Sequence, residues 1–199
     1  MAKLYPLIFV SFFSLFSCSS LYSCSLFYGS SDTYENFDVY YNTHNNEAFV
    51  SGYSWPDQSN HDITIPDTYQ NSETNETYTV TAMGGFFGRG LPCPFYVDII
   101  PYISIGDSVD DYMTPYTEED ESNYANVTYY DFTLNIGPHI KTIFVDTFIY
   151  VLVQTDGSKD GYIYRFYATV DQNNSTFYSQ DGKVYRTKDS SLYSDFIYY

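Results

Sequence analysis

Apolar and polar residues alternate along much of the chain, which predicts a protein built mainly from β-strands. The clearest case is the pair of segments FDVYYN (37–42) and AFVSGYS (48–54), which are separated by the turn residues THNNE. Asn45 and Asn46 in this turn tolerate positive φ angles, so the pair predicts a β-hairpin. Long stretches with the 3.6-residue period of an amphipathic helix are hard to find, and we expect little helix.

Further segments with the same alternation predict more strands, which are bounded by Gly, Pro or Asp-Gly turns. They are 62–66, 78–82, 95–109, 133–136, 148–153 and 162–170. Residues 107–130 are acidic and polar, with the run EEDE at 118–121, and they predict a long solvated loop. A calcium site in this loop is the alternative, although the run lacks the Gly-punctuated Asp and Asn alternation of an EF-hand loop.

The N-terminal segment has the pattern of a secretory signal. Lys3 precedes an apolar run at 4–16, and small residues follow. This run is shorter than the roughly 20 residues that a membrane-spanning helix needs. We therefore expect a signal peptide at 1–17, a Ser-rich tether at 18–36 and a β-rich domain at 37–199.

The same segment resembles a bacterial lipoprotein signal, in which a cysteine is acylated after cleavage. Leu15-Phe16-Ser17-Cys18 is the first candidate, and Leu21-Tyr22-Ser23-Cys24 is the second. Lipid attached at Cys18, or alternatively at Cys24, would replace the removed segment as the membrane anchor. The other interpretation is a signal peptide without lipid. Cys93 is the only later cysteine, so a disulfide framework is absent.

The charge balance excludes one class of partner. The chain has 8 basic and 25 acidic residues, a net charge of −17, and no basic residue occurs between Lys3 and Arg89. Nucleic-acid binding requires cations that neutralise phosphates, so we expect no nucleic-acid partner. Anionic membrane surfaces would repel the same charge, so we expect membrane contact only through the N-terminal lipid.

Motifs that carry chemistry are lacking. The sequence has no Gly-rich phosphate loop, paired-cysteine zinc pattern or HExxH. His44, His61 and His139 are far apart, and His61 and Asp62 would point to opposite faces of a strand. We therefore assign no catalytic residue, metal or cofactor, and we do not expect an enzyme. Because carboxylates are abundant, a glycosidase-like pair stays an alternative.

Tyrosine is the remaining candidate for recognition. The chain has 25 Tyr and 16 Phe, and exposed tyrosines offer rigid amphipathic contacts to a protein or glycan. We name a possible binding face of five residues. They are Trp55, Tyr162, Tyr164, Tyr178 and Tyr185. The alternative is that these side chains fill the core, since only alternate residues of a strand share a face.

Three regions share an alternating apolar strand followed by a Pro or Gly break, and Ile103-Ser104-Ile105-Gly106 is one of them. The other two also have a second short strand with an aromatic residue. They are DITIPDTY with YTVTAMGGFF, and TLNIGPHIKTI with the following Thr147-Phe148. Such units must stack to bury their apolar faces. The pattern resembles the BspA-like leucine-rich repeat family of bacterial surface proteins, whose units read roughly "I-x-I-P" and then "V-x-x-I-G-x-x-A-F". The preceding EAFVSGYS segment resembles the N-terminal cap of such arrays.

The segment YATVDQNNSTFYSQDGKVYRTKDSSLY is similar to another segment of that family, "V-x-x-x-N-x-x-Y-x-S-x-D-G-x-L-Y-x-x-x-x-x-x-L". The matching residues are Val170, Asn174, Phe177 or Tyr178, Ser179, Asp181, Gly182, Val184, Tyr185 and Leu192. Asp181 and Gly182 also predict a tight two-residue turn between two strands. The resemblance covers most of 47–90 and 133–193 but not 107–130.

The resemblance implies a mainly β fold: a short leucine-rich-repeat-like solenoid with an N-terminal hairpin cap and a C-terminal hairpin module. It also implies a non-enzymatic, adhesin-like protein at the cell surface or secreted, which binds a host or matrix protein or another surface component. Two alternatives stay open. One is a secreted glycan-active enzyme or carbohydrate-binding β-domain, and the other is a structural fragment of a larger surface array.

Overall fold

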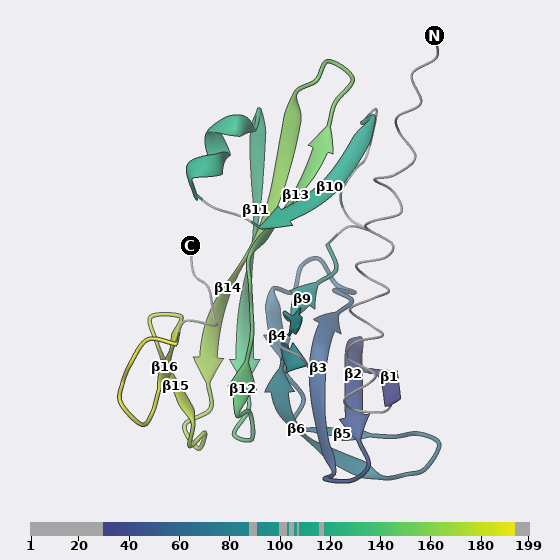
Figure 1. The fold of residues 1–199 in the computed structure, drawn as a ribbon, viewed down its shortest axis with the longest axis vertical. Helices are drawn as coiled ribbons and strands as arrows, with labels where there is room; N and C mark the ends of the chain where they lie inside the picture. Colours follow the sequence, from purple (N-terminus) through teal and green to yellow (C-terminus); the bar gives the residue numbers. More distant parts are fainter. Residues whose placement is uncertain are drawn as a thin grey trace.

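The computed structural model describes residues 30–87, 91–99, 103, 106, 108–115 and 118–193, and it is mainly β, as the alternation predicts (Figure 1). Two open sheets and two separate hairpins make up the fold. No helix in these ranges is both long and apolar enough to cross a membrane. The expected signal peptide and the anchor candidates Cys18 and Cys24 lie outside the described residues.

The first sheet follows the order β1-β2-β3-β6-β12, with β5 paired to β6 and β9 paired to β3. Its strands are β1 (Ser30–Tyr34), β2 (Phe37–Asn42), β3 (Glu47–Tyr53), β5 (Thr68–Gln70), β6 (Thr77–Met83), β9 (Tyr96–Val97) and β12 (Thr142–Ile143). The β2–β3 hairpin confirms the prediction from FDVYYN and AFVSGYS, and Asn46 in its turn has a φ of 55°.

The second sheet follows the order β10-β13-β14-β11-β4. Its strands are β10 (Asp110–Pro115), β13 (Phe148–Val153), β14 (Lys159–Val170), β11 (Asn126–Ile136) and β4 (Asp62–Thr64). A short 3₁₀ helix, Glu118–Asn123, precedes β11. The hairpins are β7 (Gly85–Phe87) with β8 (Leu91–Cys93), and β15 (Phe177–Gln180) with β16 (Lys183–Arg186).

Each sheet contains a run of three parallel strands. In the first sheet β6 pairs in parallel with both β3 and β12, and in the second β11 pairs in parallel with both β4 and β14. Among the described strands, the chain therefore crosses twice from the second sheet to the first, once between β4 and β5 and once between β11 and β12. The β7–β8 hairpin follows β6 in the chain. After the hairpin the chain returns to the first sheet, where Phe95 forms a bridge with Val145 and β9 pairs with β3.

One continuous cluster of buried apolar side chains joins the two sheets. It includes Val39, Val50 and Val80 from the first sheet, and Leu134 and Phe166 from the second. Burial of such side chains stabilises the fold by about 25 cal/mol for each Å² of apolar surface removed from water. In Figure 1 the upper halves of β11 and β14, together with β10 and β13, extend beyond the first sheet.

The structure corrects the predicted tether. Residues 30–34, which we expected to belong to it, form β1 and pair antiparallel with β2 over five residues. The Tyr69 hydroxyl donates a hydrogen bond of 2.6 Å to Asp32 of this strand. Backbone pairing and a tyrosine contact therefore hold a segment whose composition alone indicates a flexible linker.

The predicted acidic loop at 107–130 is also wrong for much of its length. Residues 110–115 form β10, which pairs with β13, and 126–130 are the first residues of β11. The Asp111 carboxylate accepts a hydrogen bond of 2.6 Å from the Tyr150 hydroxyl on β13. Because the Asp111 carboxylate has a hydrogen-bond donor, its place in the strand costs little free energy. The acidic residues therefore did not prevent this segment from forming a strand.

The turn at Asp181 and Gly182 forms as predicted. Their φ values are 52° and 76°, and both are positive, as a tight two-residue hairpin turn requires. The hairpin lies against the edge of β14, where Ala168 N–H donates to the Gly182 carbonyl at 2.7 Å and Val170 N–H donates to the Ser179 hydroxyl at 3.0 Å. The hairpin therefore satisfies backbone donors that β14 presents beyond the end of β13.

We expect Gly182→Val to lower the free energy of unfolding by about 1–3 kcal/mol, because a β-branched residue is strained at positive φ. Its Cβ would also lie 3.0 Å from Cδ1 of Tyr167. Thermal unfolding followed by circular dichroism should show a midpoint lower by about 2–4 °C for each kcal/mol. Gly182→Asn is the control, since asparagine tolerates this conformation. Equal midpoints for the two variants would contradict the argument.

Candidate interaction face

The surface of the second sheet that faces away from the core carries the candidate site. On β11, Phe132 and Leu134 point into the core, so the odd-numbered residues point outward. In the parallel register Asp131 lies opposite Arg165, Thr133 opposite Tyr167 and Asn135 opposite Thr169. We call this surface the outer face. It comprises Asp62, Thr64, Tyr129, Asp131, Thr133, Asn135, Arg165, Tyr167 and Thr169.

Arg165 and Asp131 form a two-pronged ion pair across the outer face. The distances are 2.6 Å from Nε to Oδ1 and 2.8 Å from Nη2 to Oδ2. The hydrogen bonds that Arg165 donates to Asp131 raise the pKa of Arg165 above its ordinary value. The guanidinium also lies over the ring of Tyr129, 4.2 Å from its centroid. These contacts hold the arginine in one orientation, although a pair this exposed contributes only about 0–1 kcal/mol to stability.

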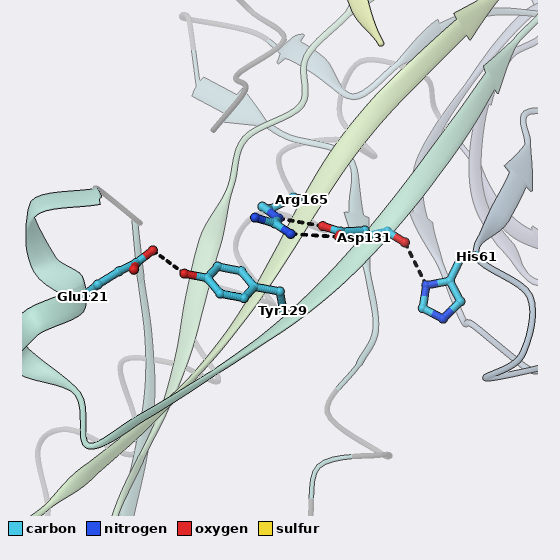
Figure 2. A network of polar contacts seen from close by, with 5 residues as sticks. All are labelled: His61, Glu121, Tyr129, Asp131 and Arg165. Carbon is cyan, nitrogen blue, oxygen red and sulfur yellow. Dashed lines mark hydrogen bonds and ion pairs between the residues drawn. The ribbon is translucent and has the colours of Figure 1, made fainter. Parts of the chain in front are cut away.

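Two further contacts extend the network, as Figure 2 shows. The Tyr129 hydroxyl donates to Glu121 of the 3₁₀ helix, and Nδ1 of His61 lies 2.7 Å from the carbonyl oxygen of Asp131. A carbonyl can only accept, so Nδ1 carries the proton in this contact. The network thereby ties together the 3₁₀ helix, the residue before β4, and the strands β11 and β14.

Asp131 and His61 lie close together, but not as a catalytic pair. The Asp131 carboxylate accepts both of its bonds from Arg165, and His61 contacts the backbone of Asp131, so carboxylate and imidazole do not form a proton-transfer pair. Within the described ranges, no group of three or more His, Cys, Asp or Glu side chains is placed to hold a metal ion. What the outer face offers is two tyrosine rings, each 38% exposed, beside an oriented arginine.

Trp55 does not belong to an exposed face, so its assignment to a binding surface is wrong. It is 2% exposed, and its Nε1 donates a hydrogen bond of 2.8 Å to the Asn60 carbonyl. Its ring meets those of Phe132 and Tyr130 edge to face. The position of Trp55 beside a proline in a loop predicts an exposed side chain. In the structure its side chain packs against β11 instead.

The binding-face assignment is also wrong for Tyr164, which is 1% exposed and packs in the core. Tyr162 lies on the same side of β14 and is half-buried against that core. The outer-face residues of β14 are Arg165, Tyr167 and Thr169, which alternate with the core-facing positions. The apolar Phe166, which shares the side of Tyr162 and Tyr164, was the signal that could have indicated this.

Tyr178 and Tyr185 lie opposite each other on the β15–β16 hairpin. Their rings stack at 5.3 Å with an interplanar angle of 19°, and both side chains are half-buried. The neighbouring Phe177 and Val184 point the other way, into the core. This tyrosine pair is therefore partly open to solvent, but it lies on a different element from the outer face.

Tyrosine hydroxyls repeatedly partner carboxylates, a feature that sequence reasoning missed. The pairs are Tyr69–Asp32, Tyr78–Glu76, Tyr96–Asp38, Tyr129–Glu121 and Tyr150–Asp111. The hydrogen bond to Glu76 is the main cause that raises the pKa of Tyr78 to about 12. In a chain with 8 basic and 25 acidic residues, tyrosines supply donors that cations supply elsewhere.

Comparison with known proteins identifies no family for this chain. No protein-family model matches it, and no curated protein does either. A weak structural match is "The Crystal structure of Pneumococcal vaccine antigen PcpA", at 10% sequence identity and a TM-score of 0.18. The match covers 80% of this chain and 54% of that one, so the chain spans about half the length of its neighbour. At this TM-score the likeness carries no argument about fold or function.

Proposed function

We propose that this protein is a non-enzymatic, adhesin-like interaction protein, secreted or held at the cell surface, and that its outer face binds an extracellular matrix protein. The observation that carries the proposal is the pairing of Tyr129 and Tyr167, each 38% exposed, with Arg165 on one rigid sheet surface. Tyrosine and arginine are enriched among the few residues that carry most of the binding energy of protein interfaces.

The rigidity of this surface supports the proposal further. Arg165 is held by two bonds to Asp131, and Tyr129 is held at its hydroxyl by Glu121. Side chains that are already ordered lose less conformational freedom when a partner binds, so more of the contact energy appears as affinity.

The proposal includes a short leucine-rich-repeat-like solenoid, in which β4 with β6 and β11 with β12 are successive units. The two sets of parallel strands support this interpretation, since each of these units contributes one strand to each set. The β2–β3 hairpin would be the N-terminal cap, and the β15–β16 hairpin the C-terminal module. An acyl group on Cys18 or Cys24 would anchor the protein at the surface.

The test measures binding of the purified protein to immobilised fibronectin, laminin, fibrinogen and collagen by surface plasmon resonance. For a ligand that binds, the double variant Tyr129→Ala/Tyr167→Ala should lose about tenfold or more in affinity, or about 1.4 kcal/mol. Val109→Ala is the matched control, because Val109 is exposed and lies outside the outer face. A double variant that binds as tightly as the control would refute the proposed site, and binding confined to a glycan array would favour the carbohydrate-binding alternative.

A further inference from the structure

A hollow of about 250 Å³ lies where β4, β11 and β14 end. Its rim includes Thr64, Asn135 and Thr169, which are in register across the three strands, and Asn135 Nδ2 lies 3.4 Å from the Thr64 hydroxyl. These three residues belong to the outer face. The hollow therefore lies at the end of the outer face where β4, β11 and β14 terminate.

The hollow combines apolar walls with two carboxylates. Pro138, which is half-buried, supplies apolar surface, Ile65 and Ile136 form the floor at 2% exposure each, and Asp67 and Asp171 supply the charge. None of its lining residues is a lysine, arginine or histidine. Such a site fits a ligand that carries an apolar stem and a cationic head.

Both carboxylates retain open oxygen atoms. The side chain of Asp67 accepts no hydrogen bond from any described residue, and its Oδ1 lies so close to Gly137 that a Cβ there would overlap it. Asp171 accepts bonds from Asn173 through Oδ1 alone, at 2.7 Å from the backbone N and 3.0 Å from Nδ2. Oδ2 of Asp171 and Oδ2 of Asp67 thus accept no hydrogen bond from any described residue.

A second hollow, of about 270 Å³, differs in this respect. It is lined by Asp32 and Asp38. These carboxylates already accept hydrogen bonds from the hydroxyls of Tyr69 and Tyr96, at 2.6 and 2.5 Å. Each carboxylate of that hollow thus already has a tyrosine donor, whereas no described residue donates to the side chain of Asp67.

We propose that the Asp67–Asp171 hollow receives a lysine or arginine side chain of the protein that the outer face binds. The methylene groups lie against Ile65, Ile136 and Pro138, and the cationic head donates to the two carboxylates. The inference rests on the proposed function, since it specifies the chemistry of that partner. A net charge of −17 also attracts basic surfaces and repels acidic ones, which favours the same partner.

The test is an amide NMR titration of the whole protein with Nα-acetyl-lysine amide and Nα-acetyl-arginine amide at low ionic strength. Nα-acetyl-norleucine amide is the uncharged control with a similar stem. We expect saturable shifts at Thr64, Asn135 and Thr169 for the two cationic probes and none for norleucine. The larger response identifies the preferred cation. Shifts that do not saturate and are scattered over the acidic surface would overturn the proposal, as would equal shifts with norleucine.

Three variants and one control variant sharpen this test. Asp67→Asn and Asp171→Asn should each weaken the cationic probes by about three- to fivefold. Gly137→Ala should weaken them as well, although it keeps both charges, because its Cβ displaces the Asp67 carboxylate. Glu73→Gln removes the same charge from an exposed loop and should leave the titration unchanged. Equal affinities for Asp67→Asn and Glu73→Gln would refute the site.

The two proposals can fail separately. If the cationic probes bind in the hollow but no matrix protein binds, the proposed function is wrong and the cation site stands. If a matrix protein binds through Tyr129 and Tyr167 and Asp67→Asn leaves its affinity unchanged, the proposed function stands and this inference is wrong.

Discussion

Replacement of Asn174 by alanine is expected to lower the free energy of unfolding by about 3–5 kcal/mol. Asn174 is 6% exposed and makes four side-chain hydrogen bonds. Its Nδ2 donates to the carbonyls of Gly137 and Ile140 at 2.8 and 3.0 Å, and its Oδ1 accepts from the amides of Thr176 and Phe177 at 2.8 and 2.9 Å. Alanine would leave all four backbone groups unpaired in or near the core, and each costs roughly 1–3 kcal/mol before relaxation and water entry.

Asn173→Ala is the matched control for this prediction. Asn173 precedes Asn174 in the chain, but it is exposed, and its side chain bonds only to Asp171. Its replacement should cost less than about 1 kcal/mol, as exposed substitutions usually do. Chemical denaturation of both variants gives the comparison, and unfolding free energies that agree within about 0.5 kcal/mol would show that Asn174 does not hold these segments together.

A second large effect is expected in alkaline solution, where the native state should lose stability as the pH rises above about 10. Burial, the leading cause in each case, raises the pKa of Tyr69, Tyr96, Tyr150 and Tyr164 above the ordinary value of 10.0. A raised pKa means that the folded state keeps its protons while the unfolded state releases them. The stabilisation is therefore complete below about pH 10 and is lost as the pH rises towards the folded-state values.

Tyr164 allows the sharpest measurement of this effect. Its burial is the main cause of the raised pKa, and the nearby Asp146 carboxylate adds to it. A tyrosine that stays protonated in the folded state until well above pH 11 costs about 1.4 kcal/mol of stability at pH 11. Tyr164→Phe removes the hydroxyl and keeps the ring, so its stability should fall less between about pH 9 and pH 11. Urea denaturation at each pH measures the difference.

Two results would contradict this prediction. Tyrosinate absorbance reports how many tyrosines ionise as the pH rises. If it showed all of them titrating near pH 10 without loss of native circular dichroism, the buried hydroxyls would not be protected. If Tyr164→Phe followed the parent at every pH, the hydroxyl of Tyr164 in particular would not contribute.

The local elements of this protein were largely determined by its sequence. The apolar run 148–153 forms β13 with the same bounds, and the β2–β3 hairpin begins and ends within one residue of its predicted strands. Asp181 and Gly182 adopt the predicted turn. These features depend on side-chain alternation and on backbone conformations that few residues tolerate, and both can be read over a few neighbouring positions.

Only the tertiary structure decided which tyrosine and tryptophan side chains are exposed. Alternation shows that Tyr164 and Tyr167 point to opposite sides of one strand, but the position of the other sheet determines which side is buried. The same holds for Trp55, which a neighbouring strand covers, and for β10, whose acidic residues are held by distant β13. The hollow between Asp67 and Asp171 joins residues more than a hundred positions apart, and long-range pairing of this kind leaves no local pattern in the chain.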